Sequence, residues 1–502
     1  NMALNSYVTA DGREIGRAQG VQAEACGIEA TTDMNPVLIK PTGDMHSQIV
    51  VHGKPYQHLS AMKYREDFLP VAKPIVMDAL NRLRDEYQLV VMEGAGSPAE
   101  INLKQRDIVN MNLAGWAEAP VILVGDIDRG GVFAFLVGTL ELLEPEERAR
   151  VKGFIINKFR GDLELLRPGL DWLEQRTGIP VLGVLPFLPD LEIEAEDSVI
   201  LDSYASTLKQ GRDIDIAVIR YPRISNFTDF DMLAAESDVS VRYVQRASEL
   251  GEPDVIILPG SKDTISDLAF LREQELDGAI EQYMERSAHS QLVGICGGYQ
   301  MLGDALLDPE AVESGKVKQS RGLGWLPLTT TFLPGKKTIR TAGHVLPDVP
   351  LSLYSTEPVV PVGGYEIHSG ETVYSSQVGF GLVTTGSYDV AHTNDATSTA
   401  NRGKEAKSLF LVESADGGER TEGICRVDGR VFGTYLHGLF NSDAYRRAWL
   451  DGIRQAKGLE PMAATFSAAA RREMAFNRLA DHVRRHLDMD QIYEIASLPK
   501  NP

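Results

Sequence analysis

Short apolar runs alternate with helix-like segments through most of the first 190 residues. Runs that are apolar at nearly every position are typical of parallel strands that helices cover on both faces. The predicted segments are the strands 88–92, 120–124, 151–156 and 181–185 and the helices 74–87 and 163–176. The alternation predicts a parallel sheet with helices packed against it.

The pattern restarts after a polar stretch at 203–213, and new strands are predicted at 214–219, 239–244, 255–258 and 292–295. We therefore predict an α/β fold with two doubly wound parallel-sheet domains and a helical C-terminal tail. The predicted boundaries are 1–207, 208–455 and 456–502. Residues 391–420 are rich in Thr, Ser, Asn, Gly and charge, which predicts an exposed insertion or long loop.

Composition and charge narrow the classes of function. The formal net charge is −21, so nucleic acid is not expected as a partner, although a local basic pocket stays open. No apolar run reaches the ~18 residues needed to span a bilayer, which predicts no membrane insertion. The three cysteines, Cys26, Cys296 and Cys425, are too few for a disulfide framework and favour a reducing, cytoplasmic location.

Cys296 lies in the sequence Gly-Ile-Cys-Gly-Gly, directly after an apolar strand and before a helix-like stretch. This spacing is typical of a nucleophile elbow, in which the side chain sits on a sharp turn and flanking glycines avoid crowding. The backbone amide of Gly297 could then stabilise an oxyanion. The alternative is a small buried thiol without a chemical role, which would be the better interpretation of an isolated cysteine.

A base for this thiol is offered by His437, which ends a strand before a glycine and could reach the elbow from a neighbouring strand. A further loop after a strand, Pro-Gly-Ser-Lys at 259–262, could supply a second oxyanion amide from Gly260 or Ser261. Its alternative is an ordinary strand-to-helix turn.

Together, these three motifs resemble the class I glutamine amidotransferases, which release ammonia from glutamine through a thioester. The resemblance implies that Cys296 is the nucleophile and His437 the base. Many members carry a glutamate two residues after the histidine, where this chain has Leu439. The group that orients the imidazole is then absent or supplied from elsewhere, and we expect a Cys/His dyad. Glu366 and His368 are expected in a supporting or docking role, or else as surface residues.

Polar residues follow several predicted strands of the first half, at the edge where open α/β sheets bind ligands. Glu93 ends one strand beside glycines and is a candidate Mg²⁺ ligand, with Glu14 as a possible second carboxylate or else an exposed helix-start residue. The candidates for binding nucleotide or substrate are Lys40, Asp126, Asp128, Arg129, Asn157 and Lys158. Lys40 and Arg129 could equally form salt bridges.

This half resembles the ATP-dependent amidoligases related to dethiobiotin synthetase. The strings at 1–7, 35–41, 93–97, 126–131, 157–162 and 222–231 follow one another in the order typical of the cobyric acid synthase family, and the resemblance covers essentially the whole chain. It implies ATP, Mg²⁺ and glutamine as cofactor or co-substrates. It also implies a corrinoid substrate, adenosylcobyrinic acid a,c-diamide, whose four peripheral carboxylates b, d, e and g are amidated.

Two alternatives stay open at this point: the sister enzyme that amidates carboxylates a and c, and a non-catalytic remnant. The second arises because the family's phosphate-binding P-loop, Gly-x-x-x-x-Gly-Lys-Ser/Thr, does not occur in the chain. We expect that motif and the strand before it to lie upstream of Asn1.

Overall fold

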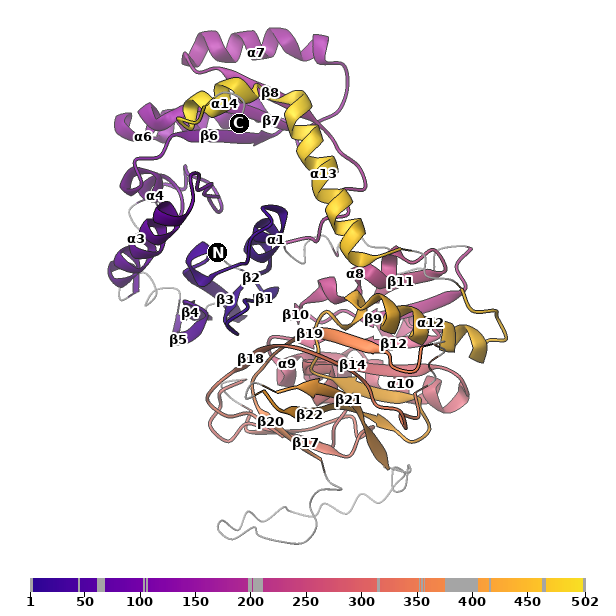
Figure 1. The fold of residues 1–502 in the computed structure, drawn as a ribbon. Coiled ribbons are helices and arrows are strands. Elements are labelled where there is room, and N and C mark those ends of the chain that lie inside the picture. Colours follow the sequence, from indigo (N-terminus) through magenta and orange to yellow (C-terminus); the bar gives the residue numbers. More distant parts are fainter. Residues whose placement is uncertain are drawn as a thin grey trace.

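The structure is a computed structural model of the chain. It describes residues 3–43, 46–60, 68–102, 104, 107–196, 201, 211–313, 317–351, 353, 355, 357–374, 405–414, 417–462 and 466–499. Two α/β units are visible, one built from the first half of the chain and one from the second (Figure 1).

A nine-stranded sheet of order β11-β9-β12-β14-β23-β22-β21-β18-β19 forms the centre of the second unit. The strands are β9 (Ile214–Ile219), β11 (Val239–Val244), β12 (Val255–Leu258), β14 (Gln291–Ile295), β18 (Lys337–Val345), β19 (Pro361–His368), β21 (Ala406–Glu413), β22 (Glu419–Arg426) and β23 (Val431–Thr434). The first five strands in this order run parallel, and the remaining four are antiparallel to their neighbours. The predicted strands of this half are confirmed, and the antiparallel extension is a feature that the pattern did not predict.

Helices and a smaller sheet surround this core. The helices are α8 (Asp231–Ala235), α9 (Thr264–Glu273), α10 (Leu276–Arg286), α11 (Gly297–Met301) and α12 (Asp443–Ala456), with 3-10 turns at Phe227–Phe230, Ala247–Glu249 and Leu439–Asn441. The smaller sheet has the order β16-β15-β17-β20, formed by β15 (Ala305–Leu307), β16 (Gln319–Arg321), β17 (Leu328–Thr331) and β20 (Glu371–Tyr374), and β10 (Ile224–Ser225) pairs with β13 (Gly260–Ser261). All four side chains of β12 are fully buried, as an interior parallel strand requires.

The first unit contains a three-stranded parallel sheet, β6 (Val121–Asp126), β7 (Val151–Phe159) and β8 (Val181–Pro186), in that order. Its helices are α1 (Arg17–Ala25), α3 (Leu69–Glu86), α4 (Met111–Trp116), α5 (Val132–Leu142), α6 (Pro145–Arg150) and α7 (Leu163–Thr177), with a 3-10 turn at Thr32–Met34. An antiparallel sheet and a short hairpin lie N-terminal to it: β3 (Val37–Gly43), β4 (His46–Val51) and β5 (Lys54–Ser60), and β1 (Ser6–Val8) with β2 (Glu14–Gly16).

Two sequence-based predictions differ from the structure. A strand is predicted at 88–92, but this segment is neither helix nor strand in the structure, and Val91 is 84% exposed. Among the described strands β6 pairs only with β7, so this apolar run has no sheet partner to bury it. The expected loop at 391–420 is also partly wrong, because β21 and the start of β22 fall within it; Phe410 is fully buried there. Residues 391–404 lie outside the described residues.

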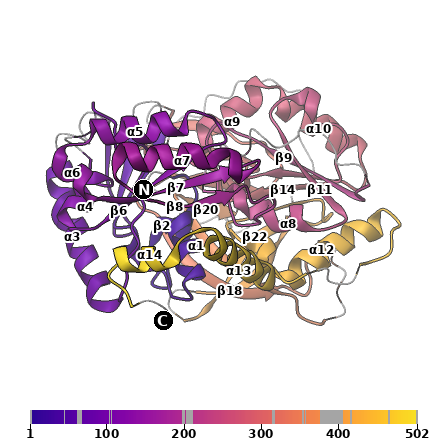
Figure 2. The same ribbon diagram turned by 90° about the horizontal axis from the view of Figure 1, so that it is seen from above.

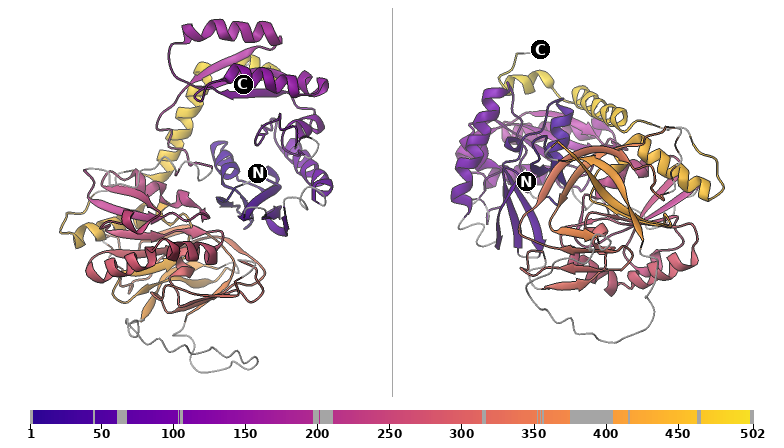
Figure 3. Two further views of the ribbon diagram at one scale, coloured as in Figure 1. Left: turned by 180° about the vertical axis from the view of Figure 1, so that it is seen from behind. Right: turned by 60° about the horizontal axis from the view of Figure 1, so that its bottom comes forward.

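The C-terminal helices connect the two units. Helix α13 (Ala468–His486) starts beside the second unit and runs to the sheet of the first, where α14 (Met489–Ile495) follows, as the views from above and from behind show (Figures 2 and 3). Gly183 of β8 forms an antiparallel bridge with Leu487, and the backbone N–H of Asp488 donates to the carbonyl oxygen of Leu182 at 2.7 Å. The predicted helical tail is therefore part of the first unit's packing. The predicted boundary at residue 207 lies outside the described residues. None of the described helices has the length and apolar character of a membrane span.

Gly183→Ala should loosen the tail. A Cβ atom at this position would lie 2.2 Å from the backbone oxygen of His486, so the α13–β8 contact must open. We expect faster amide deuterium exchange in 468–495 and a loss of roughly 1–3 kcal/mol in unfolding free energy. Gly138→Ala in α5 is the matched control, since a Cβ there meets nothing within 4 Å. Equal exchange in wild type and Gly183→Ala would contradict the prediction.

Candidate active site

Cys296 sits on the sharp turn between β14 and α11. Its backbone φ is +52°, a value that L-residues rarely adopt, and its N–H donates to the carbonyl oxygen of Thr434 at 2.8 Å. Only glycine fits at position 298, because a Cβ there would lie 1.9 Å from the backbone oxygen of Leu258. The local geometry is that of a nucleophile elbow, with a thiol that is 6% exposed.

His437 follows β23, which lies beside β14 in the sheet and runs parallel to it. The carboxyl ends of the two strands therefore meet, which brings His437 to the elbow, where the imidazole is 1% exposed. Tyr365 stacks on the imidazole with ring centroids 5.3 Å apart, and the backbones of the two residues exchange hydrogen bonds of 2.8 and 3.1 Å. The ring orientation is thus fixed from one side by β19.

Asp229 holds the other side of the imidazole. Its Oδ2 lies 2.7 Å from Nδ1 of His437, and its Oδ1 accepts a 2.9 Å hydrogen bond from the backbone N–H of Gly438. Leu439, where many amidotransferases have a glutamate, is fully packed and apolar. The orienting group that sequence analysis left open is therefore present 208 residues upstream of the histidine. The only signal in the sequence was its place in the string 222–231, which pointed to the family and not to this contact.

The electrostatics of the site favour a charged imidazole. Burial alone would lower the pKa of His437, but the Asp229 carboxylate and the Cys296 side chain outweigh it and raise the pKa to about 10. At neutral pH the ring therefore carries both protons, one shared with Asp229 and one facing Cys296. A protonated imidazole beside the Cys296 thiol can act as the acid that protonates a leaving amine.

The predicted oxyanion residues come close to one another. A Cβ added to Gly297 would lie 2.8 Å from the backbone nitrogen of Ser261, and one added to Gly260 would lie 3.1 Å from Cε1 of His437. The pairing of β10 with β13 fixes the Gly260–Ser261 backbone at this position. Gly260, Ser261 and Gly297 thus lie around the Cys296–His437 pair, where an acyl oxygen would be placed.

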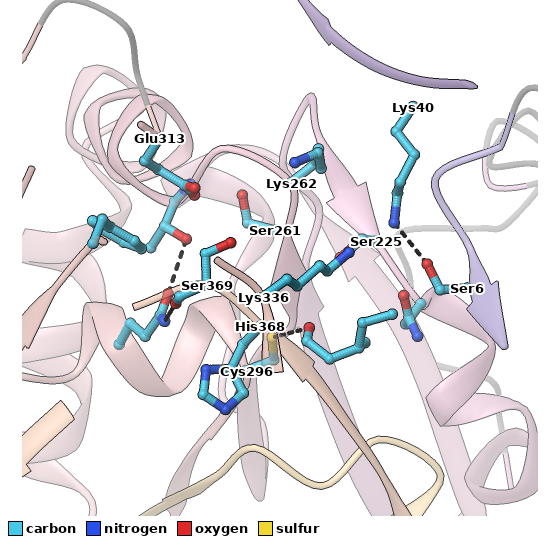
Figure 4. A pocket seen from close by; sticks show the side chains of 15 residues that line it. Ser6, Lys40, Ser225, Ser261, Lys262, Cys296, Glu313, Lys336, His368 and Ser369 are labelled. Atoms are coloured by element: carbon cyan, nitrogen blue, oxygen red, sulfur yellow. Dashed lines mark hydrogen bonds between the residues drawn. The ribbon is translucent and has the colours of Figure 1, made fainter. Parts of the chain in front are cut away.

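A pocket opens beside Cys296, and Figure 4 shows the side chains that line it. They come from both units: Ser6, Lys40, Ser225, Asn226, Ser261, Lys262, Thr264, Cys296, Gln300, Glu313, Phe332, Lys336, Ile367, His368 and Ser369. His368 stacks on Tyr435 with centroids 3.6 Å apart, and burial lowers its pKa. The carboxylate of Glu366 binds Lys337 at 2.6 Å and Arg420, and its Oε2 lies 3.6 Å from Nε2 of His368. Both residues of the Glu-x-His pair are thus part of the interior.

Lys40 lines this pocket and Glu14 lies directly beside it, so neither belongs to the parallel sheet β6-β7-β8 of the first unit. Glu14 is fully buried, and its two carboxylate oxygens bind Lys40 at 2.6 Å and Lys336 at 2.7 Å. Burial would raise the pKa of Glu14, but the two lysines outweigh it and hold the pKa far below its usual range. Burial also lowers the pKa of Lys40 to about 7. A carboxylate that two ammonium groups occupy does not fit the ligand set of Mg²⁺.

Of the remaining candidates in the first unit, five lie together and Glu93 lies apart from them. Asp126 pairs with Lys158 at 2.8 Å across the carboxyl ends of β6 and β7, and the hydrogen bond from Lys158 lowers the pKa of Asp126. The other members of this group are Asn157, which pairs in register with Asp126, and the exposed Asp128 and Arg129. Glu93 is exposed elsewhere and accepts a 3.0 Å hydrogen bond from Gln22. Among the described residues, no cluster of three His, Cys, Asp or Glu side chains is arranged to hold a metal.

Known proteins of similar sequence decide the family. Residues 215–445 match the CobB/CobQ-like glutamine amidotransferase domain, and residues 41–195 match an AAA domain. A cobyric acid synthase of Geobacillus sp. (strain WCH70) is 49% identical over 496 residues, which is 98% of this chain and 90% of that protein. The chain belongs to the cobyric acid synthase family. Cobyric acid synthases of Anoxybacillus flavithermus and Desulforamulus reducens are 48% and 47% identical, over 98% and 99% of this chain and 89% and 91% of those proteins.

Family membership identifies the chain as an enzyme of the amidotransferase–ligase class. The α/β fold class predicted from the sequence is confirmed. In this chain, Cys296, His437 and Asp229 form one connected arrangement, and substitutions at single residues can test its chemistry.

Asp229→Asn should lower the rate of glutamine hydrolysis by about 100-fold or more, because an amide no longer stabilises the charged imidazole. The measurement is kcat for ammonia release from glutamine at pH 7. Asp231→Asn is the matched control: burial and the Glu194 carboxylate raise the pKa of Asp231 to about 8, so this residue is already neutral at pH 7. Similar losses in both variants would show that Asp229 has no special role.

The protonation of Asp231 also predicts a pH dependence of stability. Its pKa rises from an ordinary value of 3.8 to about 8 on folding, so the folded state holds the proton more tightly than the unfolded state. This contribution is complete below about pH 4 and is lost as the pH rises toward 8, by at most about 1.4 kcal/mol per pH unit. Urea unfolding at several pH values should therefore show that Asp231→Asn gains stability relative to wild type between pH 4 and 8. A difference that is independent of pH would contradict this.

Proposed function

We propose that this chain releases ammonia from glutamine at Cys296 and uses it, with ATP, to amidate carboxylates b, d, e and g of adenosylcobyrinic acid a,c-diamide. The product would be adenosylcobyric acid. The observation that carries the proposal is the Cys296–His437–Asp229 arrangement, within a chain that is similar to cobyric acid synthases over nearly its whole length.

The glutaminase chemistry follows from the site. The sulfur of Cys296 attacks the side-chain amide carbon of glutamine, and the carbonyl oxygen becomes an oxyanion. Backbone N–H groups of Gly297 and of Gly260 or Ser261 stabilise that charge. His437 gives its proton to the amide nitrogen, the C–N bond breaks and ammonia leaves a thioester. Water then attacks the thioester carbon, glutamate leaves, and the proton of that water returns to the Cys296–His437 pair.

Amidation needs activation of the acceptor, because a carboxylate is a poor electrophile. ATP supplies the phosphoryl group that makes a carboxylate reactive toward ammonia. We propose the group around Asp126 and Lys158 for binding the nucleotide or the substrate, and Glu93 as a carboxylate ligand of Mg²⁺. Glu14 would have to release Lys40 and Lys336 before it bound a metal.

The ammonia-releasing pocket contains side chains of both units, which suits a transfer that avoids bulk water. Protonation converts ammonia into a cation that has no lone pair for attack, so a protected path preserves its reactivity. Ser6 and Lys40 of the first unit line the same pocket as Cys296, which supports transfer within one molecule. A cytoplasmic location and a corrinoid partner remain part of this proposal.

Cys296→Ala should abolish amidation with glutamine as nitrogen donor but retain amidation with added ammonium salt at high pH. The substitution removes the nucleophile and leaves the acceptor half unchanged. Amide product is measured by mass spectrometry with each nitrogen source, and Cys26→Ala is the matched control because Cys26 is an exposed thiol. Glutamine-dependent product from the Cys296→Ala protein would overturn the assignment.

A further inference from the structure

The pocket beside Cys296 carries two charged side chains of opposite sign that the hydrolytic chemistry does not use. Lys262 and Glu313 both line it, and in Figure 4 they lie along the side opposite Cys296. Lys262 directly follows the oxyanion residue Ser261, so its backbone position is coupled to the catalytic loop. The two residues come from separate segments, and the fold brings them to the same wall.

Hydrogen bonds hold the carboxylate of Glu313 and the backbone at Lys262 in place. The carboxylate of Glu313 accepts a 2.9 Å hydrogen bond from the backbone N–H of Thr264, which starts α9. Its own backbone N–H donates to Asp308 at 3.0 Å. The backbone N–H of Lys262 donates to the carbonyl oxygen of Arg223 at 3.0 Å. Hydrogen bonds to neighbouring segments therefore fix the positions of both residues on the pocket wall.

Neither charge is fully compensated by the protein. Burial lowers the pKa of Lys262 and raises that of Glu313, which means that the surroundings disfavour both charged forms. Each favours the other's charge at a distance, but no ion pair of 4.0 Å or less joins them among the described residues. Lys40 and Lys336 differ in this respect, because both bind Glu14 directly. A ligand with charges of both signs would stabilise Lys262 and Glu313 together.

Free glutamine is such a ligand. Three carbon–carbon bonds separate its amide carbon, which Cys296 attacks, from its α-carbon, which carries an ammonium and a carboxylate group. We propose that Lys262 binds the α-carboxylate and Glu313 the α-ammonium group of glutamine. The inference rests on the proposed glutaminase function and names the residues that select the substrate.

This arrangement explains how the site distinguishes free glutamine from a glutamine residue inside a protein chain. A glutamine within a peptide has amide groups in place of both charges, so it would cover the half-buried Lys262 and Glu313 without compensating either charge. Covering a charge without a partner costs more binding free energy than losing a hydrogen bond between neutral groups. The selectivity therefore comes from the penalty for the wrong ligand as much as from the attraction of the correct one.

Binding to the full chain tests this directly. In the Cys296→Ala background, which cannot turn over glutamine, calorimetry gives the Kd of three ligands: glutamine, glutaminamide without the α-carboxylate, and N-acetylglutamine without the α-ammonium. Lys262→Met should weaken the binding of glutamine about tenfold or more and erase the preference for glutamine over glutaminamide. Glu313→Gln should erase the preference for glutamine over N-acetylglutamine. Lys262→Gln serves the same purpose if the Met variant does not fold.

Two exposed residues provide matched controls, Lys318→Met and Glu310→Gln, which should leave all three Kd values unchanged. If Lys262→Met weakens the binding of glutamine and glutaminamide by the same factor, the role of Lys262 is overturned. If Glu313→Gln weakens the binding of glutamine and N-acetylglutamine by the same factor, the role of Glu313 is overturned. A folded Cys296→Ala protein that binds no glutamine at all overturns the proposed function together with this inference. Binding that is unaffected in both variants overturns the inference alone.

Discussion

The buried carboxylate of Asp229 is the contact on which the geometry of the active site depends. It holds the imidazole of His437 and the backbone of Gly438 at the same time, so it fixes both the ring and the chain that leaves β23. A charged imidazole that is 1% exposed would be unstable without such a partner. Cys296 and His437 follow the parallel neighbours β14 and β23 of the nine-stranded sheet, and Asp229 reaches them from the 3-10 turn Phe227–Phe230.

A second buried carboxylate joins the two units through two lysines that line the same pocket. Glu14 belongs to the N-terminal hairpin, and it binds both Lys40 of its own unit and Lys336 of the amidotransferase unit. Close by, the hydroxyl of Tyr365 donates to the backbone oxygen of Ser6 at 3.1 Å while its ring stacks on His437. Removing one partner of a buried ion pair typically costs 3–5 kcal/mol, so the interface is not free to open at random. The ammonia-releasing site is therefore built partly by the half that would consume its product.

The strands of the second unit could be predicted because each is a continuous apolar run with polar residues at its ends. The predicted 214–219 and 239–244 coincide with β9 and β11. The same criterion was wrong for 88–92, because an apolar run becomes a strand only where a neighbouring strand supplies hydrogen bonds. It also missed β21, whose short apolar run at 409–412 lies next to a stretch of polar and glycine residues. Propensity describes a segment, whereas pairing depends on the whole sheet.

The elbow at Cys296, the strand-end histidine and the order of motifs along the chain could all be predicted from the amino-acid sequence. These are local patterns, and a turn or strand end is fixed mainly by the residues next to it. Three contacts became evident only in the folded chain: Asp229 orients His437, Glu14 binds two lysines, and Lys262 and Glu313 share a pocket wall. Asp229 and His437 are 208 residues apart in sequence and 2.7 Å apart in space. Charges act through space, so their partners are set by how the units pack and not by their position in the chain.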